Sequence, residues 1–181
     1  ILHDKMILST NADSLLTIPS LGKVHSNDKR LWIFSWYENT GGSWKSNLNL
    51  VHYRTKTKEL KSILCSATGN EEQAEETTNT TNFCSNGAWF EKVYKLNAKN
   101  KDLYLCLGSG ISCNTCIYQI AMVVELTNDS INFNYPAFGA NSGDDASPGN
   151  EHEACFILDA RMGDIEHFAF DPKTQTLNYT Y

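Results

Sequence analysis

The 181-residue chain lacks long apolar runs and an excess of positive charge. A helix that crosses a bilayer needs about 20 consecutive apolar residues, and the sequence has no such run. Lys and Arg number 15 against 21 Asp and Glu, giving a net charge of -6, so the attraction that drives most nucleic-acid binding is missing. Hydrophobic residues make up 41% and charged residues 20%, as in ordinary soluble proteins. We therefore expect one domain, residues 1–181, with no nucleic-acid partner and no membrane-spanning segment.

Motifs of nucleophilic catalysis are also missing. Gly108-Ser109-Gly110 places a serine between glycines, but it lacks the G-x-S-x-G form and the strand-turn-helix context of a nucleophile elbow. Paired carboxylates such as Glu75-Glu76 lie in a polar segment without a rigid scaffold to hold catalytic geometry. The sequence therefore predicts no catalytic residues.

Metal and redox motifs are incomplete. Cys113 and Cys116 form a single C-x-x-C, and without a second one a four-cysteine zinc site is disfavoured. Strand-like sequence on both sides predicts a loop between two strands, whereas redox enzymes place this motif at a helix start. Asp144-Asp145 and Glu151-His152-Glu153 offer calcium-type oxygen ligands but not the EF-hand spacing. We expect no metal and no cofactor.

What the sequence does contain is a strong hairpin signal between Leu31 and Arg54. LWIFSWY is apolar on both sides of an extended chain, which is typical of a central strand covered on both faces. Asn39-Thr40-Gly41-Gly42 supplies turn residues, and the chain then alternates again through Leu50 and His52.

The same scheme of two alternating runs around a polar turn recurs along the chain, as is typical of antiparallel hairpins. It recurs at 50–64, 93–108, 123–138 and 168–181. The fold class predicted is all-β, as a meander, a sandwich or an irregular propeller-like array. The sequence also allows a short N-terminal helix within residues 1–18, and segments 66–82 and 138–150 are expected to be mobile loops.

Six cysteines are compatible with three disulfides in an oxidising compartment, among 15 possible pairings, or with buried free thiols. Cys65 and Cys84 bracket the first loop, and a bridge there would stabilise by roughly 3 kcal/mol in the chain-entropy model. Cys113 and Cys116 are expected to pair locally or to remain a structural pair of free thiols. Cys106 and Cys155 are left as the third pair. The chain begins at Ile1, which fits a mature chain whose leader was removed or a shortened chain.

Aromatic residues make up 11% of the chain. Trp32 and Trp36 are expected in the core. Trp44 and Trp89 lie beside glycine-containing turns, so with Tyr37 they are the candidates for a binding surface.

Several motifs between about residues 20 and 135 occur together: Ser26-Asn27-Asp28-Lys29, LWIFSW, Gly41-Gly42, the strand from Asn49 to Arg54, and LYLCLGSG followed by IYQIAMVVEL. In these motifs the chain resembles a family of secreted proteins of unknown function from gut Bacteroidetes. The cysteine content of the chain is higher than that family leads us to expect. The resemblance implies export and a β-rich fold, and it implies no activity.

Two functions follow as expectations. The first is an exported, non-catalytic binding or scaffold module for a glycan, peptide or protein. The second is a secreted hydrolase whose site is assembled from distant loops. A binding module should present aromatic side chains on its surface, whereas a hydrolase should gather titratable groups with shifted pKa values.

Overall fold

The computed structural model describes residues 21–38, 46–66, 87–138 and 154–180. These residues form antiparallel β-structure without a helix, which confirms the all-β prediction. The N-terminal segment for which a helix was considered lies outside the described residues. The segments 66–82 and 138–150 also lie outside them, apart from Ser66, which ends a strand, and Phe138.

The first sheet has four strands in sequence order, joined as an antiparallel meander. Its strands are β1 (Gly22–His25), β2 (Leu31–Glu38), β3 (Ser46–Arg54) and β4 (Leu60–Ser66). The apolar run LWIFSWYE forms β2, which lies between β1 and β3, as the sequence predicts for a strand with two apolar sides. The hairpins expected around 31–54 and 50–64 are therefore confirmed.

The second sheet is built around a long hairpin and is followed by a separate two-stranded hairpin. β7 pairs with β6 on one side and with both β8 and β9 on the other. The strands of the second sheet are β5 (Trp89–Lys95), β6 (Asp102–Cys113), β7 (Cys116–Leu126), β8 (Ile131–Asn132) and β9 (Cys155–Arg161). β10 (His167–Asp171) and β11 (Thr176–Thr180) form the last hairpin. Each remaining hairpin predicted from the sequence is present.

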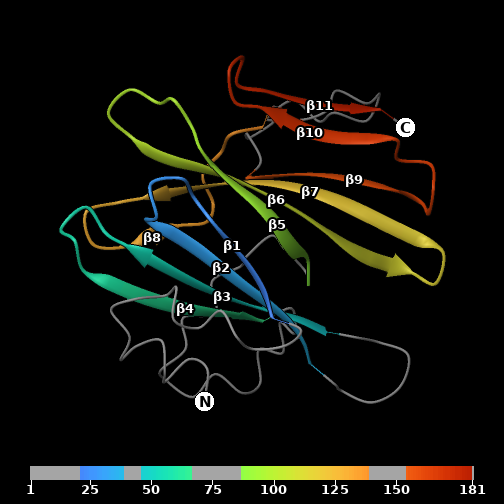
Figure 1. The fold of residues 1–181 in the computed structure, drawn as a ribbon, viewed down its shortest axis with the longest axis horizontal. Coiled ribbons are helices and arrows are strands. Elements are labelled where there is room, and N and C mark those ends of the chain that lie inside the picture. Colours follow the sequence, from blue (N-terminus) through green and yellow to red (C-terminus); the bar gives the residue numbers. More distant parts are fainter. Residues whose placement is uncertain (1–20, 39–45, 67–86, 139–153, 181) are drawn as a thin grey trace, which may run out of the picture.

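The two sheets pack face to face around one core. Alternate side chains of each strand enter that core, so Ile33 and Val51 of the first sheet meet Tyr104 and Met122 of the second. The opposite face of β6 and β7, including Leu105, packs under the β10–β11 hairpin in a second core. Figure 1 shows this order, with blue and teal strands below the green and yellow strands and the red hairpin at the top. Of the architectures considered, the first sheet is a meander, and the two sheets together form a sandwich.

Non-glycine residues with positive φ occupy the turns of four hairpins: Lys29, Lys58, Asn100 and Gln175. One left-handed residue reverses the chain within a short turn, at a modest steric cost for a residue with a Cβ. Short turns of this kind keep sequence neighbours paired, which explains why the strands on either side of each of these turns are neighbours in a sheet.

Candidate binding site

Tyr37 and Trp89 come from different sheets and stack on each other. Tyr37 lies near the end of β2 and Trp89 begins β5. Their ring centroids are 5.1 Å apart and their planes differ by 26°. Tyr37 is 49% exposed and Trp89 is half-buried, so this aromatic pair reaches the surface. Two of the three residues predicted for a binding surface are thus neighbours, while Trp44 lies outside the described residues.

The position of Trp89 depends on the missing side chain of Gly22. β1 and β5 are edge strands of their sheets and lie against each other. A Cβ added at Gly22 would lie 2.4 Å from the Trp89 ring, so the indole rests where only a glycine leaves room. The close approach of strands β1 and β5 therefore positions the aromatic pair.

A buried polar network fixes the start of β5. The Asn49 side-chain amide donates to Ala88 O at 3.0 Å, and the Ser35 hydroxyl donates to Asn49 Oδ1 at 2.7 Å. The Phe90 amide donates to Ser35 Oγ at 3.3 Å, and the Asn47 amide donates to Gly87 O. Because these bonds flank Trp89 on both sides in the sequence, they hold the indole in place.

Exposed polar groups lie beside the aromatic pair. Trp89 pairs in register with Ser109 of β6, and the Ser109 hydroxyl donates to Glu91 Oε1 at 2.9 Å. Cross-strand partners project on the same face, so an aromatic ring, a hydroxyl and a carboxylate are neighbours on this edge of the second sheet. Sequence reasoning missed Gly22 and Glu91, and it considered Ser109 only as a nucleophile. Only the register of β5 with β6 and the contact of β1 with β5 bring these residues together.

A partly buried charge cluster joins the two sheets at a different place. Arg30 contacts Asp102 at 2.8 Å, and Lys95 contacts Asp28 at 2.9 Å and Asp102 at 3.5 Å. The Tyr104 hydroxyl donates to Asp28 Oδ2 at 2.9 Å. The cluster links the turn before β2 to β5 and β6, and its two carboxylates balance its two cations.

The pKa shifts in this cluster all favour the charged ion pairs. Burial alone would raise the pKa of Asp28, but hydrogen bonds from Ser26, Lys95 and Tyr104 outweigh it and lower that pKa. Arg30 and Lys95 likewise overcome burial to lower the pKa of Asp102. Burial and the nearby Asp28 raise the pKa of the Tyr104 phenol. At neutral pH the two carboxylates and the two cations are paired ions, and the Tyr104 phenol is protonated. This arrangement links the two sheets.

Acid is expected to destabilise the protein through Asp28 and Asp102. Their folded pKa values are lowered, so their contribution is complete above about pH 4 and is lost as the pH falls through the folded pKa. Asp102→Asn should be less stable than the parent chain at pH 7 and should converge with it near about pH 2. Urea denaturation at a series of pH values measures this difference.

Asp164→Asn is the matched control, because Asp164 is an exposed carboxylate in the turn after β9. Its free energy of unfolding at pH 7 should stay close to that of the parent chain, as for other surface substitutions. Burial and the charge of Arg54 lower the pKa of His52, so the fold favours its neutral form. The contribution of His52 to stability is therefore lost over a higher pH range than that of the two carboxylates. A constant difference between Asp102→Asn and the parent across all pH values would contradict the assignment.

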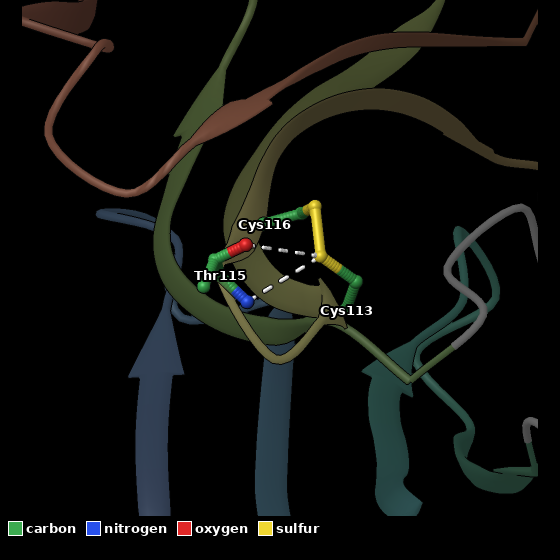
Figure 2. Close-up of a disulfide and its surroundings, with 3 residues drawn as sticks. All are labelled: Cys113, Thr115 and Cys116. Atoms are coloured by element: carbon green, nitrogen blue, oxygen red, sulfur yellow. Dashed lines mark hydrogen bonds between the residues drawn. A yellow bond between two sulfur atoms is a disulfide. The ribbon is translucent and has the colours of Figure 1, made fainter.

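The cysteines follow the prediction at one pair and depart from it at two. Cys113 and Cys116 form a disulfide in the turn between β6 and β7 (Figure 2), so the expected local pair is confirmed. Cys65 and Cys106 are free and buried, so the predicted Cys65–Cys84 and Cys106–Cys155 bridges are wrong. The partner predicted for Cys65, Cys84, lies outside the described residues. Burial raises the pKa of the Cys65 thiol to about 12.

Strand register explains why Cys106 and Cys155 are not joined. Both pair with Met122 of β7, from opposite sides. They are thus two strand spacings apart, roughly 9.6 Å, which exceeds the Cα separation that a disulfide allows. Cys65 is 5% exposed and packs in the core between the sheets.

Peptide mapping of the unreduced chain should find Cys113 linked to Cys116 and should find Cys65 and Cys106 as thiols, alkylated only after unfolding. Cys155 is itself disulfide-bonded, so its peptide should be found linked. A peptide pair that joins Cys65 or Cys106 to any other cysteine would contradict this assignment.

Two structural findings bear on metals and membranes. Within residues 21–38, 46–66, 87–138 and 154–180, no group of three or more His, Cys, Asp or Glu side chains is placed to hold a metal ion. The acidic residues considered for calcium, Asp144-Asp145 and Glu151-His152-Glu153, lie outside these ranges. In the same described part of the chain, no helix is long and apolar enough to cross a membrane.

Comparison with protein-family models, with curated proteins and with solved structures finds no match for this chain.

Proposed function

We propose that this protein is an exported, non-catalytic binding module that takes a glycan on the surface formed by Tyr37 and Trp89. The observation that carries the proposal is the stacking of these two rings at 5.1 Å across two different sheets. Strands hold side chains more rigidly than loops do, so little conformational entropy is lost when a ligand contacts this pair.

The neighbouring groups favour a glycan among the possible ligands. The C–H faces of a sugar ring pack on aromatic rings, and its hydroxyl groups donate to carboxylates. Trp89, Ser109 and Glu91 supply an aromatic ring, a hydroxyl and a carboxylate on neighbouring strands. The net charge of -6 also suits a neutral ligand better than an anionic one.

The charge cluster supports a module without catalysis over a hydrolase. It is the place where the described residues bring together titratable groups with shifted pKa values, and every ion there has a partner of opposite charge. A general acid or base needs a pKa near the working pH. The shifts of Asp28, Asp102 and Tyr104 all move away from neutrality.

Cysteine chemistry supports export as part of the proposal. Cys113 is exposed in the turn after β6, and its disulfide with Cys116 would be reduced in a compartment rich in glutathione. A protein that keeps this bond belongs in an oxidising environment, such as the periplasm or the cell exterior.

Tyr37→Ala is expected to weaken glycan binding by about 2 kcal/mol, or roughly 30-fold in Kd, the scale of an aromatic hot spot. A glycan array identifies the tightest oligosaccharide, and isothermal titration calorimetry with that oligosaccharide measures Kd for each variant. Trp89→Ala should weaken binding as much. A cooperative melt by circular dichroism shows whether each variant remains folded.

Tyr179→Ala is the matched control, because Tyr179 is 42% exposed but lies on β11. Its Kd should equal that of the parent chain. Equal losses of glycan affinity in Tyr37→Ala and Tyr179→Ala would contradict the proposal that the Tyr37–Trp89 pair binds the glycan. Turnover of a glycoside, ester or peptide that disappears on replacing one Ser, His, Asp or Glu would overturn the non-catalytic proposal.

A further inference from the structure

The Cys113–Cys116 disulfide stands at the tip of the longest hairpin of the fold, closed by the two residues Asn114 and Thr115. The cysteines are register partners at the end of the β6–β7 pairing. Cys113 is exposed and Cys116 is half-buried, so a small molecule in solution can reach the bond.

The two sulfur atoms have different surroundings. The backbone N–H of Thr115 donates to Cys113 Sγ at 3.4 Å, and the Thr115 hydroxyl lies 3.7 Å from the same sulfur. Figure 2 shows both contacts converging on Cys113. Sulfur in a disulfide carries no proton, so Thr115 is the donor in both contacts.

Such contacts gain strength when the sulfur becomes negatively charged. A thiolate is a much stronger acceptor than a disulfide sulfur, and hydrogen bonds to a charged form lower its pKa. Opening the disulfide so that the charge falls on Cys113 is therefore favoured over opening it with the charge on Cys116. In thiol exchange, the sulfur with the lower thiol pKa leaves faster.

We propose that Cys113–Cys116 is a thiol-exchange site that reacts with low-molecular-weight thiols such as glutathione, with Cys116 as the sulfur attacked and Cys113 as the leaving sulfur. A glutathione thiolate forms a bond to Cys116 Sγ, and the Cys113–Cys116 bond breaks with its electron pair on Cys113 Sγ. A second glutathione thiolate then attacks the glutathione sulfur of the mixed disulfide and releases oxidised glutathione. Two glutathione thiols are oxidised, the two cysteines are reduced, and each cysteine takes a proton from solvent according to its pKa.

The fold keeps the two cysteines together after the bond opens. Register pairing of β6 with β7 continues from Asp102 to Cys113, and the Met162 amide donates to Thr115 O at 2.8 Å from the turn after β9. Closing the disulfide again therefore needs little loss of chain entropy. Cys65 and Cys106, the free thiols in the part of the chain that the structure describes, do not compete as internal nucleophiles, because they are buried and burial raises their pKa values.

The test treats the folded, full chain with reduced glutathione, quenches with iodoacetamide and maps the products by mass spectrometry. The intermediate expected carries glutathione on Cys116 and the alkyl group on Cys113. Thr115→Val removes the hydroxyl donor, so it should slow reduction by roughly threefold, if the leaving thiol pKa rises by about one unit and the Brønsted coefficient is near 0.5. Thr176→Val, at an exposed threonine of β11, should react at the rate of the parent chain.

A second measurement isolates the leaving sulfur. In Cys116→Ser, the pH dependence of alkylation should give Cys113 a thiol pKa below the ordinary value of about 8.5, and adding Thr115→Val should raise it. Glutathione found mainly on Cys113, equal reduction rates for Thr115→Val and the parent chain, or a disulfide that resists glutathione until urea unfolds the protein would each overturn the proposal.

Discussion

Gly108→Ala is expected to lower the free energy of unfolding by about 3 kcal/mol, at the upper end of the usual cost of overpacking. An added Cβ would lie 2.7 Å from Trp89 O and 3.2 Å from Phe90 Cα. Both are backbone atoms of β5, the strand that pairs with β6 at this point. They cannot move aside without breaking that pairing, so urea denaturation should show a large shift of the midpoint.

Gly110→Ala is the matched comparison on the same strand. Its Cβ would lie 2.2 Å from Cζ of Tyr118, which is closer, but the obstacle is the far end of a side chain that can rotate. The expected loss is about 1 kcal/mol, the cost of moving one side chain from its preferred position. A larger loss for Gly110→Ala than for Gly108→Ala would contradict the role assigned to the β5 backbone.

Asn49→Ala is expected to cost about 3 kcal/mol, because it leaves buried polar groups without hydrogen bonds. Asn49 is 1% exposed, donates to Ala88 O and accepts from the Ser35 hydroxyl. Removing it uncouples β3 from the start of β5, where Trp89 stands. Thermal and urea denaturation measure the loss, and Trp89 fluorescence should change with it.

Asn178→Ala tests whether any asparagine in a strand would have the same effect. Asn178 is exposed on β11, and its amide lies 3.5 Å from Thr176 O. Its replacement should change stability by less than about 0.5 kcal/mol, as surface substitutions do. If Asn49→Ala were equally mild, the network under β5 would not be what positions Trp89.

Alternation and turn chemistry predicted the hairpins correctly, because both are local properties. LWIFSWYE predicted a central strand, and the polar turns fixed each partner strand. Sequence reasoning did not identify β1 or β9. β1 has only four residues. β9 pairs with β7 but is far from it in the sequence, and no short hairpin turn joins the two strands. Neither strand carries the local signature of a hairpin.

Local sequence patterns predict only part of the candidate site. Tyr37 and Trp89 were predicted from their places beside turns, but their stacking depends on how the first sheet meets the second. Polar residues at inward strand positions, Ser35 and Asn49, were a usable signal of a buried network. The cysteine pairs that failed were inferred from spacing along the chain, while register places Met122 between Cys106 and Cys155.

The most direct test of the central claim is to locate the bound glycan by NMR. The indole N–H signal of Trp89, assigned by its loss in Trp89→Phe, is followed as the oligosaccharide selected by the array is added to isotope-labelled protein. The account predicts saturable shifts of this signal and of the backbone amides of Tyr37 and Glu91, with Tyr179 unchanged. Saturable shifts confined to other parts of the protein, with the Trp89 indole unmoved, would contradict it.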